Sequence, residues 1–260
     1  MAKYYISEKI TPEITVTPNV AMINKGILFD WIKFEIPRGT ARLTNINLLI
    51  NCTNGSTAQA GDINFYFAKS VNGVAPNSLG TQKSTTTAAN MQLIKPHLIG
   101  TYVMDFSEEI DNLGLKTMSM LSAGGALGDG RAEQQCILQG ENDYPGTTPG
   151  YQTIFVGGIA KGTGIDLGTG VLLNQAGNQA QALDTATALT VDGTVPERLF
   201  RVGDTLKAYA AADGSGVKSI GTVVSFATNT INVDQVLEAF TDDMEICNTT
   251  PMEFTISLEY

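Results

Sequence analysis

An alternation of apolar and polar side chains with a period of two runs through most of this sequence, and it restricts the fold more than any other feature. It is clearest at the C-terminus, where Met252, Phe254, Ile256, Leu258 and Tyr260 alternate with polar residues. Successive side chains of a β-strand point to opposite faces, so this pattern predicts a strand with one buried and one solvent-facing side. We therefore expect a chain built mainly from half-buried strands.

Further strand patterns, bounded by Pro, Gly or Asn, recur along the first 160 residues. The segment 27–36 is apolar on both sides, which is typical of a central strand covered on both faces. The other candidates in this part are 13–17, 42–50, 63–67, 98–106, 135–139 and 153–159. A set of this size predicts a β-sandwich body of jelly-roll type.

The composition changes near residue 160, where a glycine-rich stretch is followed by a polar tract. Strand patterns then resume, and five short strands within about sixty residues predict a small β-barrel. These runs are 188–191, 202–209, 218–226, 230–233 and 243–247, with a tight turn at 227–229. We therefore predict an all-β protein with two parts: a β-sandwich body formed by residues 1–160 and 250–260, and an inserted small β-barrel formed by residues 161–249.

Helical patterns are weak in comparison. Short helical runs are predicted at 107–110 and 234–240. The stretch 174–189 is rich in Ala and Gln, but Gly177 and several threonines disfavour a helix there, so it is predicted as a loop or a short helix.

Residues suited to catalysis or metal binding are few. His97 is the only histidine and is expected to lie at the surface at the start of a strand, and no serine occupies a nucleophile-elbow motif. The clusters 108–111 and 242–245 are acidic, but neighbours in sequence rarely supply an opposed acid and base, so solvated loops are expected. We predict no catalytic residue, cofactor or metal ligand, and leave calcium binding by the acidic loops open.

The charge balance limits the partners. Sixteen basic and 26 acidic residues give a net charge of −10, which repels nucleic acid and anionic membranes. No apolar run is long enough for a membrane helix, and the first residues lack the apolar core of a signal peptide, so synthesis in a host cytoplasm without export is expected. Cys52, Cys136 and Cys247 are expected to be reduced, buried hydrophobic residues.

The N-terminal segment is the candidate contact site. Tyr4, Tyr5 and Ile6 lie on a piece of chain that Pro12 and Pro18 keep extended. Such a segment either forms the first strand of its own sandwich or acts as an assembly arm that reaches a neighbouring subunit. The sequence leaves both alternatives open.

These features together resemble the head auxiliary (decoration or cement) proteins of tailed bacteriophages. The resemblance lies in the arm 1–18, a body that is rich in Thr, Asn and Gly and low in charge, the module from Val202-Gly203-Asp204 through Gly221-Thr222-Val223 to 230–233, Asp242-Asp243, and the closing strand at 251–254. It implies a non-enzymatic virion protein that forms a homo-oligomer, a dimer or trimer, on the capsid lattice and reinforces the shell.

Two other functional classes remain open at this point. A carbohydrate- or receptor-binding module of a phage fibre would use exposed aromatic residues as a platform, for which Trp31, Tyr144 and Tyr151 are the candidates. A hydrolase would need a pair of carboxylates brought together from separate strands.

Overall fold

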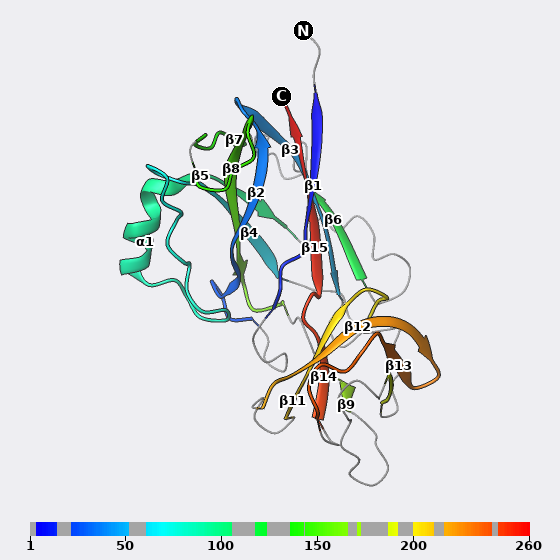
Figure 1. The fold of residues 1–260 in the computed structure, drawn as a ribbon. Coiled ribbons are helices and arrows are strands. Elements are labelled where there is room, and N and C mark those ends of the chain that lie inside the picture. Colours follow the sequence, from blue (N-terminus) through cyan, green and yellow to red (C-terminus); the bar gives the residue numbers. More distant parts are fainter. Residues whose placement is uncertain are drawn as a thin grey trace.

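The fold is that of an antiparallel β-protein, which confirms the predicted all-β sandwich class (Figure 1). In the computed structural model, the described residues are 4–14, 22–51, 61–105, 118–123, 136–142, 144–165, 171–172, 187–191, 200–210, 216–240 and 244–260. They form three sheets, two of which pack face to face.

Sheet 1 contains both terminal strands of the described chain. Its strands run in the order β1-β15-β3-β6, and β7 also pairs with β3. In the closing strand every second residue from Met252 to Leu258 is buried, as its alternation predicts. The bounds are β1 (Tyr5–Ile10), β3 (Ala41–Asn51), β6 (Met118–Ala123), β7 (Cys136–Leu138) and β15 (Met252–Glu259).

Sheet 2 has the order β2-β8-β4-β5. The prediction that 27–36 is a central strand is wrong, because β2 lies at the edge of this sheet. Residues 71–97, which we call the covering segment, lie over the outer face of β2, and this explains why that face is apolar. Trp31 packs there against a cluster that includes Leu79. The bounds are β2 (Ile27–Pro37), β4 (Asp62–Lys69), β5 (Leu98–Met104) and β8 (Tyr151–Lys161), with α1 (Ala88–Ile94) and η1 (Lys95–His97) in the covering segment.

The main core lies between sheets 1 and 2. Its centre is a group of three aromatic rings, Phe254 of β15, Phe29 of β2 and Phe65 of β4. The ring centroid of Phe254 lies 5.6 Å from that of Phe29 and 5.0 Å from that of Phe65, and both distances are within the range of favourable aromatic pairs. These contacts join strands from both sheets.

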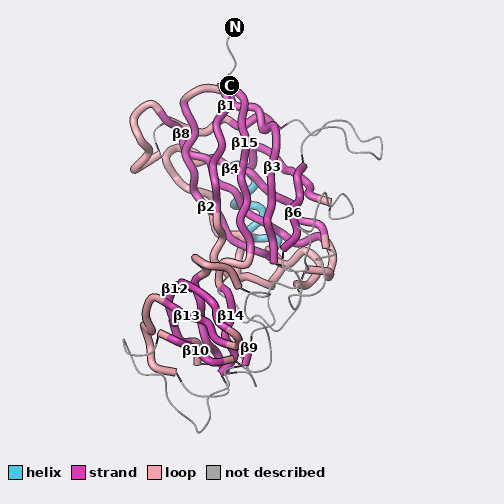
Figure 2. Tube along the Cα trace, turned by 90° about the vertical axis from the view of Figure 1, so that its right-hand side faces the viewer, coloured by secondary structure: helices cyan, strands magenta, loops and turns pink. Residues whose placement is uncertain are grey.

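Sheet 3 follows residue 170 and lies at one end of the sandwich (Figure 2). Its order is β10-β13-β12-β11-β14-β9, and β12 pairs with β11 through its first half and with β13 through its second half. The bounds are β9 (Val171–Leu172), β10 (Ala188–Thr190), β11 (Thr205–Ala210), β12 (Lys218–Ala227), β13 (Thr230–Val233) and β14 (Met244–Asn248).

The predicted barrel does not close within the described residues of sheet 3. The outer strands of the path, β9 and β10, span only two and three residues and do not pair with each other. The predicted tight turn is present, and Asn229 takes the positive φ of 57° that such a turn requires. The buried cluster of sheet 3 draws only on residues between Leu189 and Ile246. The division of the chain into a body and an inserted part at 161–249 stays a prediction.

The helical prediction for 234–240 is wrong, because this segment is extended and bent. The carboxylate of Asp234 accepts hydrogen bonds from the backbone N–H groups of Thr222, at 2.7 Å, and Gln235, at 2.8 Å. Asp side chains that bond to nearby backbone compete with helix formation in this way. The predictions at 107–110 and 174–186, and most of 13–17, lie outside the described residues.

Two of the three cysteines confirm their prediction, since Cys136 and Cys247 are free and buried, whereas Cys52 lies outside the described residues. Burial raises the pKa of Cys136 to about 11 and that of Cys247 to about 12. Because the thiolate is the reactive form, we expect both to resist thiol reagents at about pH 8 in a Cys52→Ser variant. Labelling in native buffer and in guanidinium chloride measures this, and fast native labelling would contradict the burial of the two thiols.

Candidate functional site

The predicted arm residues lie at the start of an intramolecular strand. β1 pairs antiparallel with β15 in a register that sets Tyr5 against Glu259 and Ile10 against Phe254. The backbone of residues 5–10 therefore forms a strand of this chain's own sandwich, which was the first of the two alternatives for the N-terminal segment. Tyr4 and Tyr5 nevertheless have 69% and 66% of their surfaces exposed, and Ile6 is half-buried. Contact of these side chains with another subunit stays a prediction.

Four tyrosines gather at this end of the sandwich, which we call the tyrosine end and define as Tyr4, Tyr5, Tyr151 and Tyr260. The backbone N–H of Tyr260 donates to the carbonyl oxygen of Tyr4 at 3.0 Å. The hydroxyl of Tyr260 is buried without a hydrogen-bond partner among the described residues. Burial raises the pKa of this hydroxyl above its usual range, and the charges of Glu8 and Tyr151 raise it further. The tyrosine end thus combines residues from the beginning, middle and end of the chain.

Among the described strands β1 pairs only with β15, so it forms an edge of sheet 1 that begins at the tyrosine end, where the N-terminal end of β1 lies beside the C-terminal end of β15 (Figure 1). Tyr4 and Tyr260 form a hydrogen-bonded pair, and such pairs alternate with non-hydrogen-bonded pairs along an antiparallel ladder. Ile6 and Glu8 are therefore the next residues of β1 whose backbone groups bond to β15. The backbone groups of Tyr5, Ser7 and Lys9 therefore point to the open edge. An open edge of this kind is a template for an added strand.

The three aromatic residues that a carbohydrate-binding module would use differ in their contacts and in their exposure to solvent. Trp31 is packed beneath the covering segment and donates its Nε1–H to the carbonyl oxygen of Asn77 at 2.8 Å. Tyr144 lies edge-on against Phe155, with the Nζ of Lys33 5.6 Å from its ring centroid. Tyr151 is the most exposed of the three and belongs to the tyrosine end.

His97 is buried and not at the surface, which corrects the expectation for this residue. Its Nδ1 lies 2.9 Å from the carbonyl oxygen of Lys69, so it fixes the end of η1 to the end of β4. The acidic cluster 108–111 and residues 242–243 lie outside the described residues, while Glu245 is buried in β14. Within the described ranges no three potential ligands among His, Cys, Asp and Glu lie close enough together to hold a metal ion.

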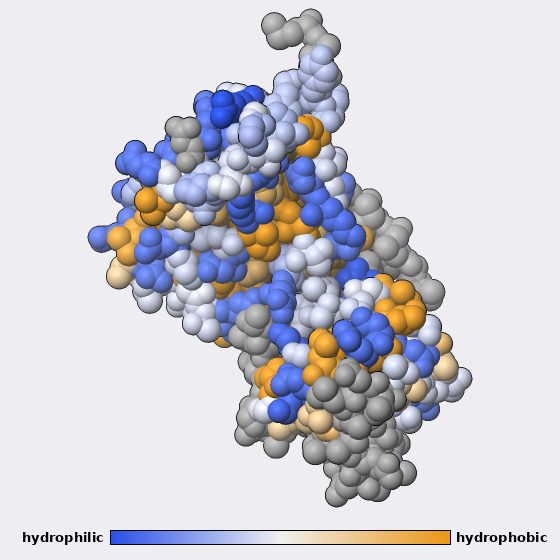
Figure 3. Space-filling view, viewed as in Figure 1, coloured by the Kyte–Doolittle hydropathy of each residue, from blue (hydrophilic) through white to orange (hydrophobic). Residues whose placement is uncertain are grey.

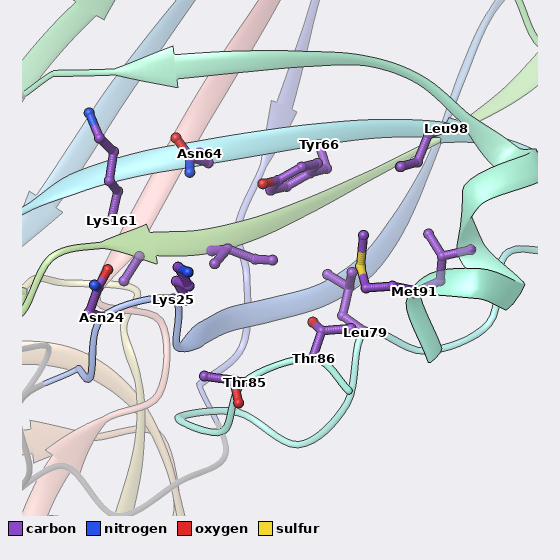
Figure 4. A pocket seen from close by; sticks show the side chains of 13 residues that line it. Asn24, Lys25, Asn64, Tyr66, Leu79, Thr85, Thr86, Met91, Leu98 and Lys161 are labelled. Carbon is purple, nitrogen blue, oxygen red and sulfur yellow. The ribbon is translucent and has the colours of Figure 1, made fainter. Parts of the chain in front are cut away.

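A pocket that sequence reasoning missed opens on the outer face of sheet 2 (Figure 4). Its volume is about 300 Å³, at the lower end of the range for small-molecule sites. Alternate residues of β4, the last three residues of β8 and the first residue of β5 form one wall, and the chain before β2 and the covering segment form the rest. The lining residues are Asn24, Lys25, Asn64, Tyr66, Leu79, Thr85, Thr86, Met91, Ile94, Leu98, Ile159, Ala160 and Lys161.

The covering segment is held to β2 by hydrogen bonds from its backbone N–H groups. The N–H of Leu79 donates to the carboxylate of Asp30 at 2.8 Å, and the N–H of Lys83 donates to the carbonyl oxygen of Ile27 at 2.9 Å. Helix α1 begins after Thr87, whose side chain caps it by accepting from the N–H of Asn90 at 3.2 Å. The cap was the available sequence signal for α1, but seven residues are too few to show a helical period.

Comparison with known protein families found no match, and comparison with the curated proteins found none. In the part of the chain that the structure describes, no helix combines the length and apolar character needed to span a membrane.

Proposed function

We propose that this protein is a non-enzymatic structural component of a virion, of the capsid decoration (cement) type, which binds the outer capsid lattice and stabilises it. The observation that carries the proposal is the tyrosine end at the open edge of β1. Tyrosine rings supply large contact areas at low conformational cost and are enriched in protein interfaces. An aromatic group beside unpaired backbone edges is suited to binding another protein chain.

The surface next to this edge supports the same function. Figure 3 shows hydrophobic residues in the strip between β2 and the pair of strands β1 and β15. Both β1 and β2 are edge strands of their sheets within the described part of the chain, so this strip runs along the side of the sandwich between these two edges. The net charge of −10 favours a place on the outside of the shell, away from packaged nucleic acid. Assembly as a dimer or trimer on the capsid, after synthesis in a host cytoplasm, belongs to the same proposal.

The test replaces exposed side chains and leaves β1 in place, because deletion of residues 2–17 would also remove the buried Ile10 and Ile14. We expect Tyr4→Ser/Tyr5→Ser to weaken binding to empty capsid shells about tenfold or more, since aromatic anchors dominate interface energy. Co-sedimentation with shells measures attachment, and sedimentation velocity of the protein alone measures self-association. Urea melts of the variant should match those of the wild type.

The matched control is Val202→Ser/Val224→Ser, which changes an apolar residue in the turn before β11 and one in β12, 65% and 53% exposed. It should bind shells as the wild type does. Equal binding by the tyrosine variant and the wild type would refute the proposed role of the tyrosine end. Glycan binding that Tyr151→Ala abolishes, without any binding to shells, would favour the alternative of a carbohydrate- or receptor-binding module.

A further inference from the structure

The pocket on sheet 2 has two chemically different ends (Figure 4). Lys25, Asn24, Asn64 and Lys161 lie on one side, and Leu79, Met91 and Leu98 lie on the other. The ring of Tyr66 extends along the pocket between the two groups. A ligand that fits both ends needs a polar head and an apolar body.

The polar end is positively charged, although the protein as a whole is strongly acidic. Lys161 pairs with the carboxylate of Asp62 at 3.0 Å, whereas Lys25 forms no ion pair within the described residues. Among the described residues, the two ammonium groups and one carboxylate at this end leave one positive charge uncompensated. The backbone of Lys25 has a φ of 64° and its N–H donates to the carbonyl oxygen of Ala160 at 2.9 Å, which holds the residue in the turn at the mouth of the pocket.

Two buried polar atoms in the lining lack a hydrogen-bond partner among the described residues. They are the Oδ1 of Asn64 and the Oγ1 of Thr86. Most buried polar atoms in proteins are hydrogen-bonded, so each exception needs a physical explanation. Asn64 comes from β4 and Thr86 from the covering segment, and both lie on the pocket wall. The hydroxyl of Thr86 can donate to an oxygen of a bound molecule, whereas the Oδ1 of Asn64 only accepts, so the Nδ2–H2 group is the part of this amide that can donate to an anion.

We propose that this pocket binds a small amphipathic carboxylate, which accepts from the ammonium group of Lys25 and the Nδ2–H2 group of Asn64, with its hydrocarbon chain against Leu79, Met91 and Leu98. A free amine is disfavoured because it would place a second cation beside Lys25. A long unbranched sugar is disfavoured because one end of the pocket offers only apolar side chains. This inference is independent of the assembly role, since the pocket and the tyrosine end share no residue.

The experiment titrates isotope-labelled protein with octanoate, octan-1-ol and octylammonium, following amide chemical shifts. We expect saturable shifts around residues 64–66, 79–94 and 159–161, with octanoate binding at least about fivefold more tightly than octylammonium. Lengthening the chain from hexanoate to octanoate should tighten binding severalfold, because each methylene moved from water into the pocket adds favourable transfer energy.

Two variants locate the site, and a third serves as the control. Lys25→Gln removes the charge and keeps a polar side chain, so it should weaken octanoate severalfold and leave octan-1-ol unchanged. Met91→Trp fills the apolar end from a position that is 39% exposed, and it should weaken octanoate and octan-1-ol about tenfold. Lys218→Gln, in sheet 3, should change neither. Octanoate binding that is absent, or that is insensitive to both pocket variants while their spectra remain native, overturns the proposal. The Tyr4→Ser/Tyr5→Ser variant should bind octanoate normally.

Discussion

Replacing Phe254 by alanine is expected to lower the free energy of unfolding by about 3 to 5 kcal/mol. The ring is fully buried and stacks on Phe29, with an interplanar angle of 28°, while it meets Phe65 edge-on at 65°. Removing the ring takes away its contacts with Phe29 and Phe65 of sheet 2. It also leaves a cavity between strands that cannot collapse freely. Urea denaturation of the wild type and the variant measures the difference.

The control for this substitution is Thr255→Ala, the next residue of β15, whose side chain lies on the opposite, partly exposed face. It should change stability by less than about 0.5 kcal/mol, as most surface substitutions do. A loss below about 1 kcal/mol for Phe254→Ala would show that the ring does not join the two sheets.

The second large effect is expected at Gly158 of β8. This glycine lies between Phe29 on β2 and Phe65 on β4 in the strand register. A Cβ at this position would clash with the ring of Phe29, which packs directly on the glycine backbone. Because the ring is held in the three-ring group of the core, it has little freedom to move, and Gly158→Ala should cost about 1 to 3 kcal/mol.

A double-mutant cycle separates this clash from a general preference for glycine in the strand. Phe29→Leu removes part of the ring volume, so the double variant Gly158→Ala/Phe29→Leu should be less destabilised than the sum of the two single variants. Additive losses in urea melts would show that the substitutions act independently and that the packing of Phe29 on Gly158 is not the cause.

Much of the strand content could be predicted because alternation is a local property. The side chains of β15 and β4 follow a period of two, and each buries every second residue along most of its length. The position of β2 within its sheet could not be predicted this way. An apolar outer face looks the same whether a second sheet covers it or, as for Trp31, a loop segment does.

The tyrosine end could be predicted in part from the sequence, whereas the pocket could not. Tyr4 and Tyr5 could be selected because aromatic residues near a chain end need a partner surface. Tyr151 and Tyr260 could not be placed beside them, since β1 pairs with β15 from opposite ends of the chain and β8 belongs to sheet 2, which packs against their sheet. The pocket was invisible for the same reason, because Lys25, Asn64, Thr86 and Lys161 come from four separate segments.

The sequence by itself determined the β-class, the positions of most strands, the core-facing residues of β15 and the acidic net charge. These properties follow from composition and from side-chain period, which each segment carries alone. The tertiary structure alone decided which strands form edges, that sheet 3 stays open in its described part, and which distant residues form the tyrosine end and the pocket. Strand pairing and the covering of a sheet face are contacts between remote segments, and their energies depend on packing that no single segment contains.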